Sequence, residues 1–225
     1  ISYGGSCSSS TTIAISGNNT ITLDSLSDGT YSDCIIVVRG TTGYLSNTLT
    51  ITTFIVDTTA ATLEEVTSVT TPNNDTTPNY TFSSSEAGTI SYGGSCSSST
   101  TIAISGNTTI TLVSLSDGTF SDCTITVTDN SSNSVTLNIS LFIIDTTAPT
   151  VSSISPTDNQ SWVSRSGNIS VTFSKVMYNT SVTTNTSNTT CSGSFQLSSD
   201  NFSSCVQMSS SPTSSNSNMT FTTKP

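Results

Sequence analysis

The sequence predicts an all-β protein made of tandem β-sandwich domains, and three observations predict it. Apolar residues alternate with Ser and Thr at a period of two, clusters of turn residues separate the alternating runs, and one long segment occurs twice. No segment combines a helical period with helix caps. We expect the domains to form an extended rod, because the linkers between them are short.

The repeated segment sets the size of one domain. Residues 1–34 and 90–123 are identical at 31 of 34 positions, at an offset of 89 residues. The copies then diverge and align again at an offset of 88, so that Asp57 corresponds to Asp145. The three differences, first copy before second, are Asn19/Thr108, Asp24/Val113 and Tyr31/Phe120. A period near 88 residues is too long for a solenoid repeat and has the size of one small β-sandwich.

The complete copy, residues 58–145, contains seven short alternating runs with Gly, Asn, Asp and Pro clusters between them. Their apolar members are, in order, Val66 and Val69; Tyr80 and Phe82; Ile90 and Tyr92; Ile102 and Ile104; Ile110, Leu112 and Leu115; Cys123, Ile125 and Val127; and Val135, Leu137, Ile139, Leu141 and Ile143. Thr is β-branched and suits the outward positions of such strands. Seven short strands in a domain of this size are typical of an immunoglobulin-like sandwich.

Two further domains flank this copy. Residues 1–57 correspond to the later part of the repeat and lack its first two strands, and residues 146–225 form a second type of sandwich. Strands of that last domain are expected at Val151 and Ile154; Ile169, Val171 and Phe173; Phe195 and Leu197; Val206 and Met208; and Met219 and Phe221. We expect the chain to be a fragment of a longer repetitive protein. An alternative is that neighbouring chains supply the missing strands by strand addition.

The composition excludes several classes of function. Only 8% of the residues are charged, and the formal net charge is -10 with four Lys and Arg. So few cations cannot neutralise a phosphate backbone, which excludes nucleic-acid binding. The chain has no His, which excludes chemistry that depends on imidazole. No apolar run approaches the ~20 residues of a membrane-spanning helix, so membrane insertion is not expected.

Several motifs carry a family resemblance. In the repeat they are Asn79-Tyr80-Thr81-Phe82, Leu115-Ser116-Asp117-Gly118-Thr119-Phe120, Ile125-Thr126-Val127-Thr128-Asp129 and the linker Ile144-Asp145-Thr146-Thr147-Ala148-Pro149-Thr150. In the last domain they are Ser155-Pro156-Thr157-Asp158-Asn159 and Asn168-Ile169-Ser170-Val171-Thr172-Phe173-Ser174. Residues 1–145 resemble the bacterial Ig-like repeat domains of large surface adhesins, and residues 146–225 resemble the Ig-like domains of S-layer and related surface proteins. The resemblance implies Ig-like sandwiches that act as spacers in long extracellular proteins.

The six cysteines fall as two per domain. The pairs are Cys7 and Cys34, Cys96 and Cys123, and Cys191 and Cys205. An even number, paired placement and an extracellular type of composition favour three disulfides within domains. The alternatives are metal binding, for which the sequence offers neither a C-x-x-C motif nor a His, and buried free thiols.

Carboxylates are expected to gather at two places where neighbouring domains meet. The first group is Asp28, Asp57 and Asp129, with Glu86 near it, and the second is Asp117 and Asp145, with Asp158 from the last domain. Such clusters suit Ca²⁺, which takes six to eight oxygen ligands. The alternative interpretation is that these acids are ordinary turn and strand-end residues.

Other candidate sites are weaker. Glu64 and Glu65 are the one acidic dyad and have no aromatic groove around them in the sequence, so we expect no enzyme activity. Thirteen Asn-x-Ser/Thr sequons occur, which permit glycosylation, although a polar strand face needs no sugar. Examples are Asn18, Asn107, Asn138, Asn168 and Asn218.

The predicted function is structural: an extracellular or cell-surface stalk, fibre or coat segment whose partners are neighbouring copies or domains of the same protein. One alternative is an adhesive module for a surface glycan or protein, with Tyr44, Trp162 and Tyr178 as exposed aromatic candidates. A second is self-assembly into a filament or layer through edge strands, with residues 35–38 and 141–144 as the apolar segments best able to pair.

Overall fold

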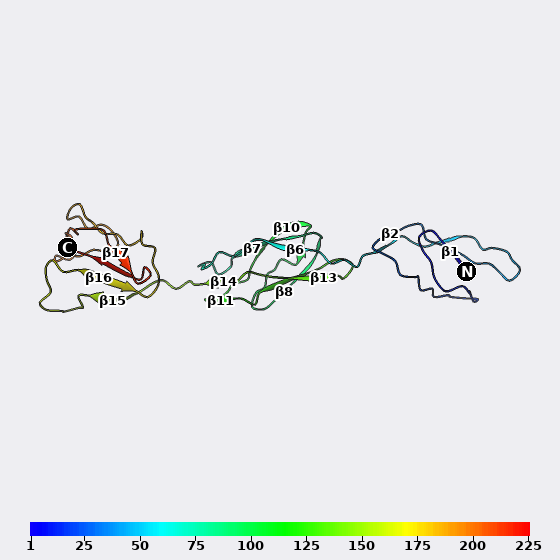
Figure 1. The fold of residues 1–225 in the computed structure, drawn as a ribbon, viewed down its shortest axis with the longest axis horizontal. Helices are drawn as coiled ribbons and strands as arrows, with labels where there is room; N and C mark the ends of the chain where they lie inside the picture. The colour runs from blue at the N-terminus through cyan, green and yellow to red at the C-terminus, as the bar shows by residue number, and fades with distance from the viewer. The chain divides into compact units, whose positions relative to one another are not determined.

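A computed structural model describes residues 1–225 and contains eighteen β-strands and no helix (Figure 1). The all-β fold class is therefore confirmed, and no helix is present that could span a membrane. The chain divides into two compact units, residues 1–146 and residues 147–225. The first unit holds both copies of the repeat, and the second holds the domain of different sequence.

The complete copy folds as two antiparallel sheets. One contains β6 (Leu63–Thr67), β7 (Asn79–Ser84) and β10 (Gly106–Thr111), in the order β10-β7-β6. The other contains β8 (Gly88–Gly93), β9 (Ile102–Ala103), β12 (Thr124–Thr128) and β13 (Ser134–Asn138), in the order β13-β12-β8-β9. A separate pair joins β11 (Gly118–Phe120) to β14 (Phe142–Ile144). This arrangement is that of an immunoglobulin-like sandwich.

The core of this sandwich consists of the inward positions of both sheets. Tyr80 and Phe82 on β7 and Ile125 on β12 are all 0% exposed. They pack with the Cys96 and Cys123 side chains and with aliphatic residues of the neighbouring strands. The period-two pattern predicted these positions correctly, because each strand presents alternate side chains to one face.

The last strand differs from the prediction. The sequence alternation runs without a break from Val135 to Ile143, but the structure interrupts it at Ser140, so that β13 and β14 lie in different sheets. After the break the phase is inverted: Leu141 is 54% exposed and Phe142 is fully buried. The Glu65 carboxylate accepts hydrogen bonds from the Ser140 backbone N–H (3.1 Å) and hydroxyl (2.8 Å), which satisfies the interrupted backbone.

Replacing Glu65 with Ala is expected to destabilise the complete copy by about 1–3 kcal/mol, because the Ser140 N–H loses its acceptor. The matched control is Glu64→Ala, since the adjacent Glu64 is exposed and lies on the same strand. We expect that control to change the free energy of unfolding by less than about 0.5 kcal/mol. Urea unfolding of both variants measures the difference, and equal effects would contradict the role given to Glu65.

A second difference concerns the short strand β9. The pattern placed Ile102 and Ile104 as its alternating pair, but they are 58% and 56% exposed, and Ala103 between them is 0% exposed. The inward position of this strand is therefore shifted by one residue from its two large apolar side chains, which point outward. The small Ala103 is buried opposite Gly88 in the β8–β9 pairing, where little space is left for a larger side chain.

The first copy has the same sequence as the second but fewer strands. Its strands are β1 (Ser2–Gly4), β3 (Ile35–Val37) and β4 (Leu49–Thr50) in one sheet, and β2 (Gly29–Tyr31) and β5 (Phe54–Val56) in a pair. Residues 11–28 contain no strand, although the equivalent residues 100–117 contain β9 and β10. In the complete copy, β10 pairs with β7 along six residues.

Equivalent apolar side chains are also more exposed in the first copy than in the complete copy. Ile110 and Leu112 of the complete copy are 0% and 1% exposed. Their counterparts, Ile21 and Leu23, are only half-buried. Equivalent residues of the two copies therefore lie in different environments within a single chain.

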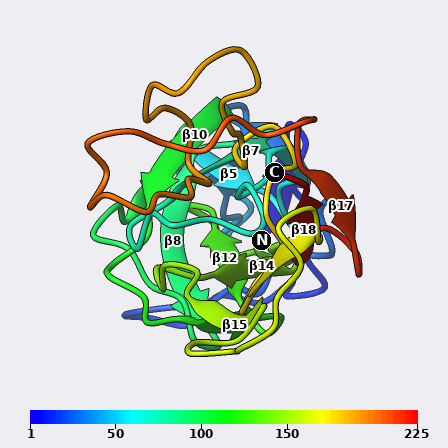
Figure 2. The ribbon, with the colours of Figure 1, turned by 90° about the vertical axis from the view of Figure 1, so that its left-hand side faces the viewer.

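The second unit contains one four-stranded antiparallel sheet. Its strands are β15 (Val151–Ser155), β16 (Ile169–Phe173), β17 (Thr213–Ser215) and β18 (Thr220–Thr223), in the order β15-β16-β18-β17. Figure 2 shows β15 and β17 at opposite margins of this sheet, with β18 between them. A small core of Val171, Val182 and Phe221 lies against it.

The strands expected at Phe195–Leu197 and at Val206–Met208 are absent, and β17 takes a place that the pattern did not predict. These segments are irregular but keep some backbone pairing: the Val206 N–H donates to the Leu197 carbonyl at 2.8 Å. The surrounding residues are rich in Asn, Ser and Thr, whose side chains bond to nearby backbone. Asn185, for example, accepts from the Ser187 N–H and donates to the Thr190 carbonyl. Such local bonds compete with a regular ladder.

Candidate functional site

The six cysteines form three disulfides, each within one predicted domain. The pairs are Cys7–Cys34, Cys96–Cys123 and Cys191–Cys205, with Cα atoms 5.3, 5.2 and 4.9 Å apart. No cysteine is left free. In the complete copy the bond joins the turn after β8 to the segment before β12, so it ties neighbouring strands of one sheet at their end.

The turn beside this disulfide has the same geometry in both copies. Gly94 has φ +70°, and a Cβ there would lie 2.0 Å from the Asp122 carbonyl oxygen, so only glycine fits. The next residue, Ser95, donates its hydroxyl to Asp122 Oδ2 at 2.9 Å, and this bond lowers the pKa of Asp122. The first copy repeats the arrangement with Gly5, Ser6 and Asp33. These glycines and acids are thus structural parts of the disulfide turn.

Three carboxylates come together at the end of the complete copy that lies beside the linker. Oxygen atoms of Asp57, Glu86 and Asp129 all lie within 4.8 Å of one another. Asp57 follows β5, Glu86 lies in the turn between β7 and β8, and Asp129 follows β12. The structure therefore brings together two of the acids predicted for the first group, together with the glutamate expected near them.

Asp129 is the most enclosed of the three and is 8% exposed. Burial raises the pKa of this carboxyl, but hydrogen bonds from Asn133 and Ser131 outweigh it and leave the pKa lowered. Its Oδ1 accepts from the Ser131 N–H (2.8 Å) and the Asn133 N–H (2.9 Å), and its Oδ2 accepts from Asn133 Nδ2 (3.0 Å). Asn133 Nδ2 also donates to the Asp57 carbonyl oxygen at 3.1 Å, so the sequence analysis missed a residue that holds the linker.

Asp28 and Asp117 have a different role. Asp28 Oδ1 accepts from the Thr58 N–H (3.0 Å) and hydroxyl (2.7 Å), and Asp117 Oδ1 accepts from Thr146 at 2.9 and 2.7 Å. The Thr59 hydroxyl is the largest cause of the lowered pKa of Asp28, followed by Thr58. Neither acid belongs to the carboxylate group around Asp129. They fasten the Asp-Thr-Thr segments that follow β5 and β14.

The remaining acids of the second predicted group, Asp145 and Asp158, belong to different compact units. Asp145 follows β14, and its backbone N–H donates to the Asn73 carbonyl at 2.9 Å. Asp158 belongs to the other compact unit and follows β15. The group of carboxylates that the geometry supports as a cation site is therefore the one formed by Asp57, Glu86 and Asp129.

This carboxylate group meets part of what a hard cation needs. Asp57 Oδ1 already accepts from the Thr59 N–H at 3.1 Å, and Asp129 has one lone pair left on Oδ2 after its protein donors. Three carboxylates and nearby backbone oxygens are the ligand chemistry of Ca²⁺. The protein donors around Asp129 also stabilise its negative charge.

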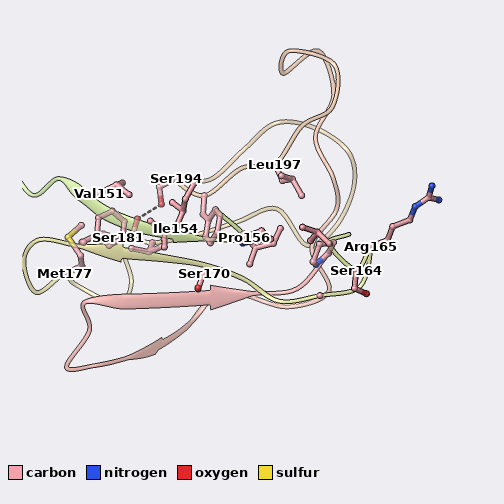
Figure 3. Close-up of a pocket in the computed structure, with 18 residues that line it drawn as sticks. Val151, Ile154, Pro156, Ser164, Arg165, Ser170, Met177, Ser181, Ser194 and Leu197 are labelled. Carbon is pink, nitrogen blue, oxygen red and sulfur yellow. Dashed lines mark hydrogen bonds between the residues drawn. The ribbon is translucent and has the colours of Figure 1, made fainter. Parts of the chain in front are cut away.

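The second unit contains an apolar cleft that the sequence analysis did not predict (Figure 3). Its volume is about 670 Å³. Its apolar lining residues are Val151, Ile154, Pro156, Val163, Ile169, Val171, Phe173, Met177, Val182, Phe195, Leu197 and Pro225. Ser194 donates to the Ser181 carbonyl at 2.7 Å beside the cleft, and the Arg165 side chain points away from it (Figure 3). The cleft exists because irregular segments, and not a second sheet, cover this face of the single sheet.

Comparison with known families now decides the nature of the second unit. Residues 145–225 match the family model of the bacterial Ig-like domain. This segment carries a bacterial Ig-like domain. A search of curated proteins found no match. The matched residues contain the sheet β15-β16-β18-β17, the Cys191–Cys205 bond and the apolar cleft, so the cleft lies within the matched domain.

The aromatic and glycosylation candidates are mostly on the surface. In the bacterial Ig-like domain, Trp162 is 100% and Tyr178 is 87% exposed, and Tyr44 in the first copy is 82% exposed. Of the sequons named above, Asn18, Asn107, Asn138 and Asn168 are exposed and Asn218 is half-buried. None of the three aromatic residues lies in a strand, and Tyr44 belongs to a different compact unit from Trp162 and Tyr178.

Proposed function

We propose that this chain is a structural, non-catalytic segment of an extracellular protein, a stalk, fibre or coat spacer of the kind found in adhesins. The observation that carries the proposal is the structure of the complete copy. It is one Ig-like sandwich whose two sheets enclose a fully buried core, and the Cys96–Cys123 disulfide links two of its neighbouring strands. Bacterial Ig-like domains are in general surface modules without enzyme activity, and the match of residues 145–225 supports the same role here.

The surface of the complete copy suits a spacer. Pairs of Thr hydroxyls bond across its strands, as between Thr81 and Thr109 (2.8 Å) and between Thr126 and Thr136 (2.7 Å). These ladders stabilise neighbouring strands without charge or exposed apolar area. Residues 58–145 also contain eight acidic and no basic residues, and this net negative charge keeps repeated copies soluble and apart.

The test is a length measurement on a cell surface. The chain is placed between a membrane anchor and a fluorescent protein, and the height of the fluorophore above the membrane is measured by energy transfer to a lipid dye. We expect each added copy of residues 58–145 to raise the fluorophore by one equal step. A height that does not change with copy number would overturn the spacer function.

We also propose that the Asp57, Glu86 and Asp129 group binds Ca²⁺ and stabilises the linker. The support is the distance of 4.8 Å within which all three carboxylates lie. Added Ca²⁺ should raise the unfolding temperature of the wild-type chain, since a ligand that binds only the folded state stabilises it. The variant Glu86→Gln should lose the rise, whereas Glu64→Gln, which alters an exposed acid elsewhere, should keep it. The absence of heat on calorimetric titration with millimolar Ca²⁺ would exclude the site.

A second candidate function, adhesion, is favoured by one observation. Trp162 is the single tryptophan of the chain, and it is fully exposed with φ +62°. Because no other residue contributes tryptophan emission, binding of a surface glycan at this position should shift or quench the fluorescence directly. Fluorescence titration of the wild-type chain with a panel of surface oligosaccharides tests this, and calorimetric titration of Trp162→Ala, which has no tryptophan emission, must show loss of binding. If the tryptophan emission stays unchanged with every sugar, adhesion at Trp162 is excluded and the spacer function remains as the proposal.

A further inference from the structure

The loop between β15 and β16, residues 156–168, displays the one tryptophan of the chain. Trp162 is 100% exposed and has φ +62°, a backbone conformation that bulky residues rarely adopt. Tryptophan is highly buried in most folded proteins, because its ring carries a large apolar surface. A fully exposed ring at a strained backbone position is the kind of outlier that clusters at ligand-binding sites.

Local hydrogen bonds determine how this loop presents its side chains. Before Trp162, the Gln160 N–H donates to the Thr157 carbonyl at 3.1 Å, and Gln160 Oε1 accepts from the Thr157 N–H at 3.0 Å. After Trp162, the Gly167 N–H donates to the Ser164 carbonyl at 3.0 Å. The tryptophan therefore lies between two hydrogen-bonded turns, so the loop is ordered by its backbone and not by burial of the ring.

Arg165 lies three residues after Trp162 and is the only basic residue of the loop. Its side chain is exposed and points away from the apolar cleft (Figure 3). It makes no hydrogen bond or ion pair within the chain, and the loop contains a single acid, Asp158. Three residues of extended chain span at most about 11 Å, so the indole and the guanidinium can contact one small molecule together.

The net charge of this unit differs from that of the rest of the chain. Residues 1–146 contain twelve acidic side chains and one basic side chain, which gives a net charge of −11. Residues 147–225 contain two acidic and three basic side chains, which gives +1. An anionic ligand is therefore repelled by the first unit and not by the second.

We propose that Trp162 and Arg165 bind a saccharide that carries a carboxylate. The apolar face of a sugar ring stacks on the indole, and the guanidinium donates paired N–H groups to the two carboxylate oxygens. Asn159 and Ser161 are exposed in the same loop and offer polar groups to the sugar hydroxyls. This inference rests on the adhesion proposed for Trp162 and adds the chemical class of its ligand.

The composition of the loop favours a sugar over a lipid surface. Segments that lie in a membrane interface bury a continuous apolar face. Here Trp162 and Val163 are the only large apolar side chains exposed in the loop, and Val163 also lines the apolar cleft. The other exposed side chains of the loop are polar.

Calorimetric titration with two acidic sugars tests the ligand class. Sialyllactose and a galacturonate trimer are each compared with their own methyl ester, so that only the charge of the carboxylates differs. We expect at least one acid to bind roughly tenfold more tightly than its ester, and we expect high salt to reduce this difference. The acid that binds distinguishes a sialic acid from a uronic acid.

Three variants assign the contacts. Arg165→Gln should bind the acid as weakly as the ester, and Trp162→Ala should lose binding of both. Lys175→Gln is the matched control and should bind like the wild type, because it removes the same charge from the same unit but lies beyond the other end of β16. Circular dichroism checks that each variant is folded.

Equal binding of acid and ester would overturn the acidic ligand and leave adhesion at Trp162 standing. If no sugar binds, both are overturned. Binding to vesicles of phosphatidylcholine and phosphatidylglycerol that depends on Trp162, without binding of any sugar, would identify a lipid surface and overturn the saccharide site. The fluorophore-height measurement is unaffected by any of these outcomes.

Discussion

Replacing Ile110 with Ala is expected to destabilise the complete copy by about 2–5 kcal/mol, whereas the same change at Ile21 should cost less than about 1 kcal/mol. The two residues occupy equivalent positions of an almost identical sequence. Ile110 is 0% exposed in β10, which pairs with β7 and places it opposite Tyr80, and Ile21 is half-buried in a segment that contains no strand. A cavity forms at the first position, and water already reaches the second.

Scanning calorimetry of the two variants measures this difference within one molecule. The repeat reduces the usual uncertainty of comparing unlike sites, because the local sequence differs only at Asn19/Thr108 and Asp24/Val113. If Ile21→Ala were as destabilising as Ile110→Ala, the first copy would have a covered core, and the exposed state of residues 11–28 would be wrong. If both were small, the core of the complete copy would be less closely packed than its buried side chains indicate.

The sequence predicted the sandwich of the complete copy because its strands obey a local rule. Each of Tyr80, Phe82, Ile125 and Val127 lies two residues from the next inward position, and burial follows from that spacing alone. The inverted phase at Phe142 could not be predicted in this way. It depends on Glu65, which contacts Ser140 from a distance of 75 residues along the chain. A period-two pattern contains no information about such a contact.

Some features of the candidate sites could likewise be predicted from the sequence, and others could not. Asp57 and Asp129 could be placed together from the topology of an Ig-like sandwich, because a strand end and a loop at one pole meet there. The position of Asp28 could not, since the hydroxyls of Thr58 and Thr59 compete for its carboxylate. The apolar cleft also lay beyond sequence reasoning. It results from the irregular path of residues 195–208, where side chain bonds to backbone replace the expected strands.

Removing the Cys96–Cys123 bond by the double change Cys96→Ala/Cys123→Ala is expected to cost about 3.5 kcal/mol, because the 27-residue separation would no longer be closed in the unfolded chain. For a domain of this size the unfolding temperature should fall by roughly 15–25 °C. The Cys7–Cys34 bond has the same separation of 27 residues, so the loop entropy lost with it is equal.

The two disulfides should nevertheless differ in outcome, because stability is the sum of loop constraint and packing. The complete copy keeps thirteen other buried core residues after its two cysteines are replaced, and should still unfold cooperatively at a lower temperature. In the first copy, Cys7 and Cys34 are the only apolar residues before the linker that are buried. The disulfide itself therefore forms the core of this copy. Cys7→Ala/Cys34→Ala should therefore abolish the calorimetric transition of the first copy. A retained transition there, or a shift below about 5 °C in the complete copy, would show that packing and not the bond sets the stability of these domains.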